Sequence, residues 1–133
     1  MIKNNLLLPL SAKERTQLRG KRSTLDGIDV ILNLPRGGGR LIPGEVLKSE
    51  NSKVFVSIVA AHEDVIRISS ENRLKLLKAA YHLGNRHVEV EIKNNILLTK
   101  GDYVIENMLK NFDVEVKNIM EKFFPETGAH NHE

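Results

Sequence analysis

The sequence has no cysteine and no tryptophan, and aromatic residues make up only 5% of its 133 residues. Because cysteine is absent, disulfides, thiolate zinc sites and thiol nucleophiles are excluded, and a metal ion must be held by histidine, carboxylate or main-chain groups. No apolar run reaches the roughly 18 residues that span a membrane, and the apolar run near the start is short and interrupted by Pro9. We therefore expect a cytoplasmic protein without membrane contact.

Positive charge is concentrated in one region of the chain. The net charge is +3, and between Lys13 and Arg40 seven basic residues stand against three acidic ones. Such a region is either a solvated surface or a surface that attracts an acidic partner. Arg36 and Arg40, at the two ends of the turn sequence "RGGGR", are the candidate partner-binding residues.

A change of periodicity divides the chain into two halves. The first half contains short alternating apolar runs between turn residues, which predicts an all-β N-terminal domain over residues 1–61. Its expected strands lie in "ERTQLRG", "IDVILNLP", "EVLKSE" and "KVFVSIVAA". From residue 62 onward, strand and helix patterns alternate.

The second half follows the order strand, helix, strand, strand, helix, strand. This order predicts a ferredoxin-like βαββαβ domain over residues 62–124, with four antiparallel strands and both helices on one face, so that the whole chain is α+β. Asp102 is the expected N-cap of the second helix. In "HVEVEI", Glu89 and Glu91 fit the polar face of an exposed strand. Residues 125–133, "PETGAHNHE", are polar and predict a short disordered tail.

The first helix of this half has both ends marked in the sequence. Ser70 is the expected N-cap, and Gly84 is the expected left-handed residue just past the C-terminal end. Three large apolar residues recur at three- and four-residue spacing and are expected to bury against the sheet: Leu74, Leu77 and Tyr81.

Histidines are the candidate metal ligands, since neutral imidazole suits nickel, copper and zinc. His82 and His87 are five residues apart across a glycine, so they lack the i, i+4 spacing that would place both on one helical face. They are either turn residues with local hydrogen bonds, or His87 takes further ligands from elsewhere. A twofold-symmetric dimer with His87 near its axis supplies a second imidazole, and His130 and His132 add ligands from the tail. His62 is interpreted as structural.

Other classes of function find little support. No catalytic motif is present, and the consecutive residues His62, Glu63 and Asp64 in "AHEDV" alternate in direction along a strand, so we expect no enzyme activity. "PRGGGR" lacks the pattern of a phosphate-binding loop. A nucleic-acid-binding module fits the basic charge, but "HVEVEI" and "ILLT" hold no aromatics on which bases could stack.

The octet "AYHLGNRH", followed by a strand and by the Asp-led helix "DYVIENML", closely resembles the urease accessory protein E (UreE) family, which delivers nickel to urease. The similarity extends from "ERTQLRGKRSTLDGIDVILNLPRGGGRLIPGEVL" to the histidine-bearing end of the chain. The resemblance implies an N-terminal β domain that contacts protein partners, a ferredoxin-like metal-binding domain, and a homodimer joined through the latter.

The resemblance also implies site residues and partners. His87 matches the main Ni2+ ligand of the family, paired across the dimer, while His82 matches the first histidine of the motif and His130 and His132 match the histidine-bearing tail. Tyr103 stands where many members have a histidine. The implied partners are the urease apo-complex and the urease accessory GTPase, and nucleic acid is not among them. A general storage or buffering protein for nickel, zinc or copper is the alternative function.

Overall fold

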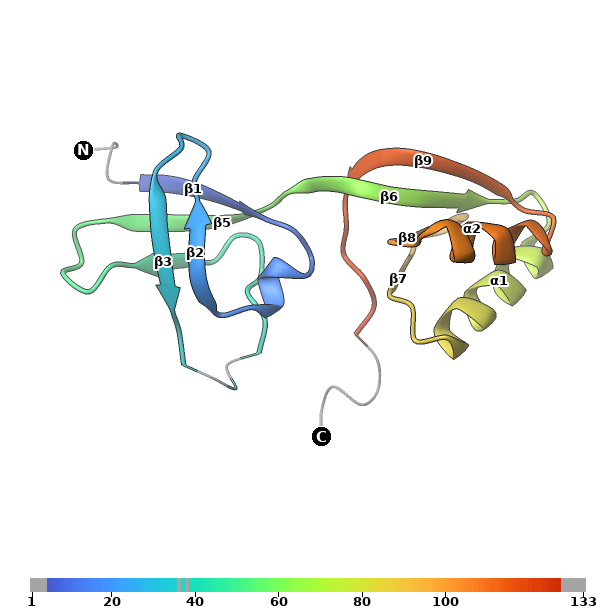
Figure 1. Ribbon diagram of the computed structural model, residues 1–133, viewed down its shortest axis with the longest axis horizontal. Coiled ribbons are helices and arrows are strands. Elements are labelled where there is room, and N and C mark those ends of the chain that lie inside the picture. Colours follow the sequence, from blue (N-terminus) through green and yellow to red (C-terminus); the bar gives the residue numbers. More distant parts are fainter. Residues whose placement is uncertain (1–4, 36, 38, 128–133) are drawn as a thin grey trace. The chain divides into compact units, whose positions relative to one another are not determined.

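The structure is a computed structural model that describes residues 5–35, 37 and 39–127. Over that part of the chain it is a mixed α+β protein, which confirms the predicted class (Figure 1). Contacts divide the chain into two compact units, residues 1–61 and residues 62–133, which are described separately. No helix in the described residues is long and apolar enough to cross a membrane.

The first unit is built from strands. β5 (Phe55–Ala60) pairs in parallel with β1 (Asn5–Leu10) and antiparallel with β4 (Val46–Lys48), while β2 (Arg19–Ser23) and β3 (Asp29–Asn33) form a separate antiparallel pair. Alternate residues of β1 and β5 point inward, as the period of two requires. The core of this unit consists of Leu6, Leu8, Leu10, Leu32, Leu41, Val56 and Ile58.

The strand predicted at "ERTQLRG" begins only at Arg19, because its first residues form the 3-10 helix η2 (Glu14–Thr16). A reciprocal pair of hydrogen bonds explains the difference. The N–H of Ser11 donates to Glu14 Oε1 at 2.9 Å, and the N–H of Glu14 donates to Ser11 Oγ at 3.1 Å. This capping box stabilises a helical turn where alternation alone suggests a strand.

The second unit is a sheet with two helices. Its elements are β6 (His62–Ser69), α1 (Arg73–Asn85), β7 (Val90–Ile92), β8 (Ile96–Thr99), α2 (Tyr103–Lys110) and β9 (Glu115–Lys122). In the described part of this unit the strand order is β7-β8-β6-β9, and every neighbouring pair is antiparallel. Both helices contribute to one core on one face of the sheet, where Leu83 of α1 and Leu109 of α2 join Ile68 of β6.

The N-terminal ends of the two helices are fixed by side-chain caps. At α2 the predicted cap is confirmed, since Asp102 Oδ1 accepts the N–H of Ile105 at 3.1 Å. At α1 the predicted cap Ser70 is wrong. Asn72 Oδ1 accepts the N–H groups of Leu74 and Lys75 at 3.0 and 3.3 Å, so the helix starts two residues later than the sequence suggested.

The apolar stripe predicted to bury α1 against the sheet is also wrong. Leu74, Leu77 and Tyr81 are 59%, 58% and 68% exposed. The helix instead buries a second apolar set at i, i+3 and i+7, which consists of Leu76, Ala79 and Leu83. The alanine in this set brings the helix close to the sheet, and the larger side chains are left on the opposite face.

Candidate metal centre

His87 occupies the turn that ends α1. Its backbone is left-handed, with φ of 62°. The N–H of His87 donates to the carbonyl of Gly84 at 2.9 Å, and the N–H of Val88 donates to the carbonyl of Leu83 at 3.1 Å. These two bonds form a Schellman motif in which His87 holds the position that glycine usually fills. The predicted end at Gly84 is therefore wrong, because the helix runs through Gly84 to Asn85.

The left-handed backbone makes His87 an unusual residue for this position. A side chain with a Cβ is strained there, although histidine tolerates the conformation better than most residues. The His87 side chain is exposed, and the two main-chain bonds fix the backbone from which it projects. Residues held in sparsely populated backbone regions are concentrated at functional sites, so this geometry marks His87 as a candidate ligand.

His82 lies one turn before the end of α1 and has aromatic neighbours. Its ring centroid is 4.8 Å from that of Phe112 and 5.2 Å from that of Tyr81. Phe112 follows α2, so this contact joins the two helices at one end and gives His82 a packing role as well as an exposed imidazole. His62, the first residue of β6, is exposed and pairs in register with Lys122.

The described residues do not bring three potential metal ligands together. No group of three or more histidine, aspartate or glutamate side chains with metal-binding geometry occurs among residues 5–127 as far as they are placed. His130 and His132 lie outside the described residues. A metal at His87 therefore requires ligands from the end of the chain, from a second chain or from water.

The chain that leads to His130 and His132 is held next to β7, which the sequence did not predict. Pro125 is buried, and the N–H of Glu126 donates to the carbonyl of Val90 at 2.8 Å. The N–H of Phe124 donates to Oε1 of Glu91 at 2.9 Å. The expected start of a disordered tail at residue 125 is wrong, and so is the expected exposure of Glu91, which is 8% exposed.

In the sequence, the candidate partner-binding arginines belong to the segment that connects β3 and β4. Arg36 is outside the described residues, and Arg40 is half-buried. Gly37 and Gly39 of the same segment have φ of 79° and 83°, a backbone that glycine adopts without strain.

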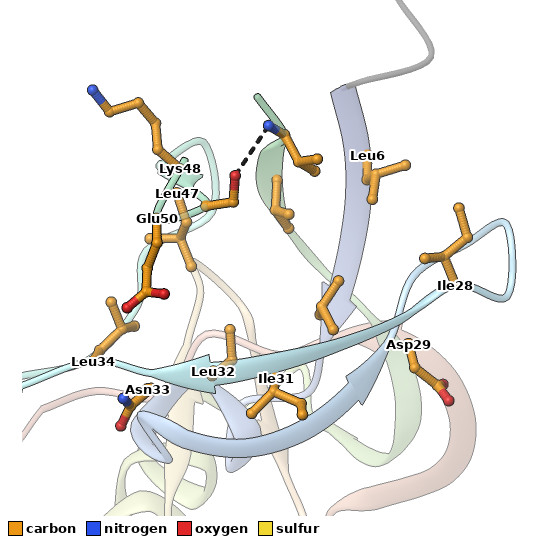
Figure 2. A pocket seen from close by; sticks show the side chains of 14 residues that line it. Leu6, Ile28, Asp29, Ile31, Leu32, Asn33, Leu34, Leu47, Lys48 and Glu50 are labelled. Atoms are coloured by element: carbon orange, nitrogen blue, oxygen red, sulfur yellow. Dashed lines mark hydrogen bonds between the residues drawn. The ribbon is translucent and has the colours of Figure 1, made fainter. Parts of the chain in front are cut away.

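A cavity of about 700 Å³ opens in the first unit between β3 and the β4–β5 hairpin (Figure 2). Leu32 of β3, Leu47 of β4 and Leu6 of β1 are among the residues that line it. Lys48 and Glu50 add charge beside this apolar lining. No histidine is among the residues that line the cavity.

Comparison with known proteins places these features in a family. Residues 63–133 match the family model described as UreE urease accessory protein, C-terminal domain. The urease accessory protein UreE of Prochlorococcus marinus (strain MIT 9215) is 59% identical over 128 residues, which cover 96% of this chain and 85% of that protein. UreE of Synechococcus sp. (strain CC9311) is 46% identical over 123 residues, which cover 92% of this chain and 79% of that protein.

Proposed function

This chain belongs to the family of UreE urease accessory proteins, and from that premise we propose that it is a nickel-binding metallochaperone, which delivers Ni2+ to apo-urease while the urease active site is assembled. Its role in urease maturation follows from membership of the family. Ni2+ is then cargo that the chain binds and releases in the cytoplasm, and no catalytic step is required.

The position of His87 is the observation that carries the proposal. An exposed imidazole projects from a backbone fixed by two main-chain hydrogen bonds. Glycine would satisfy the same left-handed backbone without strain, so the turn itself does not explain a histidine there. A metal ligand needs an accessible lone pair and a backbone of fixed conformation, and His87 meets both requirements.

We infer that the second unit is a ferredoxin-like metal-binding domain through which two chains dimerise. Its strand order and antiparallel pairing support this fold. The exposed residues Leu74, Leu77 and Tyr81 support the dimer, because their i, i+3, i+7 spacing makes a continuous apolar seam on the face of α1 away from the core. The seam leads toward the end of α1 that carries His87, so a twofold contact there places two imidazoles near the axis.

The chemistry of such a site suits transfer. Imidazole and water are neutral ligands, and with no thiolate in the chain the site holds a divalent metal without the strong soft bonds that would retain it. Binding requires deprotonated imidazoles, so the affinity falls as the pH is lowered. His130 and His132 are proposed as additional ligands, which can be exchanged one at a time for ligands of a recipient. His82 is proposed as an auxiliary ligand beside its packing role.

The first unit is proposed to contact the protein partners. Arg36 and Arg40 supply positive charge for an acidic surface of the urease apo-complex or of the urease accessory GTPase. The cavity between β3 and β4 offers an apolar surface in the same unit. The second candidate function, buffering of nickel, zinc or copper without a client, is favoured by the same exposed histidines and differs in requiring no such contacts.

A calorimetric nickel titration tests the central claim. The parent protein is compared with His87→Ala and with the control His62→Ala, at concentrations where light scattering gives the oligomer. We expect one tightly bound nickel per two chains in the parent and in the control, and its loss in His87→Ala. Equal binding by His87→Ala and the parent would show that His87 is a turn residue only. Nickel binding without any effect on urease activation would favour the buffering function.

A further inference from the structure

The chain crosses from one edge of the second sheet to the other after its last strand. β9 lies at one edge and β7 at the opposite edge. Immediately after β9, Phe123 is fully buried, Phe124 donates its N–H to the Glu91 carboxylate, and Glu126 donates its N–H to the Val90 carbonyl. Residues 123–126 therefore form a strap whose far end is fixed to β7.

The side chain of Glu91 contacts this strap, and its burial is unusual for a glutamate. The neighbouring Val90 faces the core that the helices cover, so Glu91 faces the opposite side of the sheet. Its Oε1 accepts the Phe124 N–H at 2.9 Å, and its Oε2 lies 3.8 Å from Nζ of Lys93. A buried carboxylate bound to a main-chain N–H makes a strong, directional contact, because the acceptor is charged and poorly solvated.

The strap fixes where the last residues of the chain begin. Val90 is three residues from His87, which is at most about 11 Å of extended chain. The N–H of Glu126 lies 2.8 Å from the Val90 carbonyl, so Glu126 is held within about 14 Å of His87. His130 and His132 are four and six residues beyond Glu126, and chains of these lengths extend up to about 14 and 21 Å. Both histidines can therefore reach His87 from this origin without any movement of the strap.

We propose that Glu91 is a positioning residue, which ties the strap to β7 and so keeps His130 and His132 within reach of His87. The inference rests on the proposed function for its purpose, but the tie itself does not depend on a metal. A short tether raises the local concentration of the tail histidines at His87 to the order of mM. Release of the strap lengthens the tether and lowers that concentration.

A disulfide pair measures this proximity without nickel. The chain has no cysteine, so Arg86→Cys with Asn131→Cys introduces a single thiol pair, beside His87 and between the tail histidines, and leaves every histidine in place. Equilibration in glutathione buffers, with intrachain and interchain disulfides separated by electrophoresis, gives the effective concentration. We expect Glu91→Leu to lower it at least fivefold. Glu91→Gln, which keeps the oxygen acceptor, should stay within twofold of the parent pair.

Two further variants keep the test decisive. Glu89→Leu makes the same substitution at an exposed position two residues away and should leave the effective concentration unchanged. Phe124→Pro removes the N–H donor without altering β7 and should reproduce the loss even if Glu91→Leu fails to fold. An unchanged effective concentration in folded Glu91→Leu or in Phe124→Pro would overturn the proposal.

The nickel titration then separates the two proposals. If His87 binds nickel, Glu91→Leu should weaken binding, but not beyond the loss seen in a chain truncated after Thr127, and the truncated chain should lose nothing more when Glu91→Leu is added. A parent that binds no nickel overturns the proposed function, while the disulfide measurement still decides whether Glu91 positions the tail.

Discussion

The N–H of Val88 donates to the carbonyl of Leu83 at 3.1 Å and closes the turn that holds His87 in the left-handed conformation. The two residues also share one apolar core, since Leu83 is a fully buried member of it and Val88 packs against it. The turn is thus anchored by a main-chain bond and by the core. The candidate ligand rests on a rigid part of the unit, as a site of defined geometry requires.

Replacement of His87 by glycine should raise stability while it abolishes nickel binding. Glycine adopts φ of 62° without strain, so we expect His87→Gly to increase the free energy of unfolding by up to about 1 kcal/mol. His87→Ala retains the strain and should not be stabilised. Urea unfolding monitored by circular dichroism compares the three proteins. A glycine variant less stable than the parent would mean that the imidazole has a structural partner.

Introduction of a charge on the exposed seam of α1 should dissociate the proposed dimer without unfolding the chain. Leu77 is 58% exposed, so Leu77→Glu leaves the core intact. In a twofold dimer it places one carboxylate from each chain in the apolar interface. Light scattering should change from the dimer to the monomer mass. The matched control is Ile31→Glu, at a site 78% exposed in the first unit, which should remain dimeric. If Leu77→Glu stays dimeric, the seam is not the interface.

The sequence predicted α2 better than α1, and the reason is visible in their residues. In α2 a single apolar set follows a strong cap, Asp102, so only one orientation buries it. In α1 two apolar sets interleave, and the set with larger side chains, such as Leu77, is more conspicuous in the sequence than the set that contains Ala79. Packing distance to the sheet decides between them, and no local pattern encodes it.

The candidate metal site was likewise only partly predictable from the sequence. The spacing of His82 and His87 left both a turn residue and a metal ligand open, and the resemblance of the motif to the UreE family favoured His87 as the candidate ligand. Its left-handed backbone was assigned instead to Gly84, the residue that usually adopts it. The role of Glu91 could not be predicted, because its partner is the main chain of Phe124, 33 residues away. A strand glutamate with a distant main-chain partner looks, in the sequence, like any exposed polar residue.

The ion pair between Lys75 and Asp113 should make a small contribution to stability that disappears in acid. Lys75 of α1 donates a hydrogen bond to Asp113 in the turn after α2, and this bond and the lysine charge lower the pKa of Asp113. A carboxyl group whose pKa is lower in the folded chain than in the unfolded chain stabilises the folded state at pH values above its pKa in the unfolded chain. That contribution is lost as the pH falls through the folded value, which lies below the ordinary aspartate pKa of about 4.

Melting temperatures of the parent and Lys75→Met therefore test the pair. The parent should melt slightly higher at pH 7, and the difference should disappear as the pH falls through the acid range below about pH 4. Lys78→Met removes the same charge from an exposed position on the same helix and should show no such pH-dependent difference. A difference that persists unchanged at low pH would assign the effect to lost packing of the Lys75 stem.

Reversal of the charge at Arg36 and Arg40 should slow association with the proposed partners and leave nickel binding unchanged. Arg36→Glu with Arg40→Glu changes the local charge by four units in the first unit, while the histidines are in the second unit or beyond the described residues. Electrostatic steering acts mainly on association, so we expect an on-rate to the urease apo-complex or the accessory GTPase lower by about tenfold or more at low salt, with a weaker dependence on salt. Surface plasmon resonance over a salt series measures both.

The control, Lys117→Glu with Lys122→Glu, makes an equal change of charge in the second unit. If both double variants slow association equally, net charge and not the "RGGGR" turn governs the encounter, and unchanged urease activation by Arg36→Glu with Arg40→Glu would remove these arginines from the docking surface.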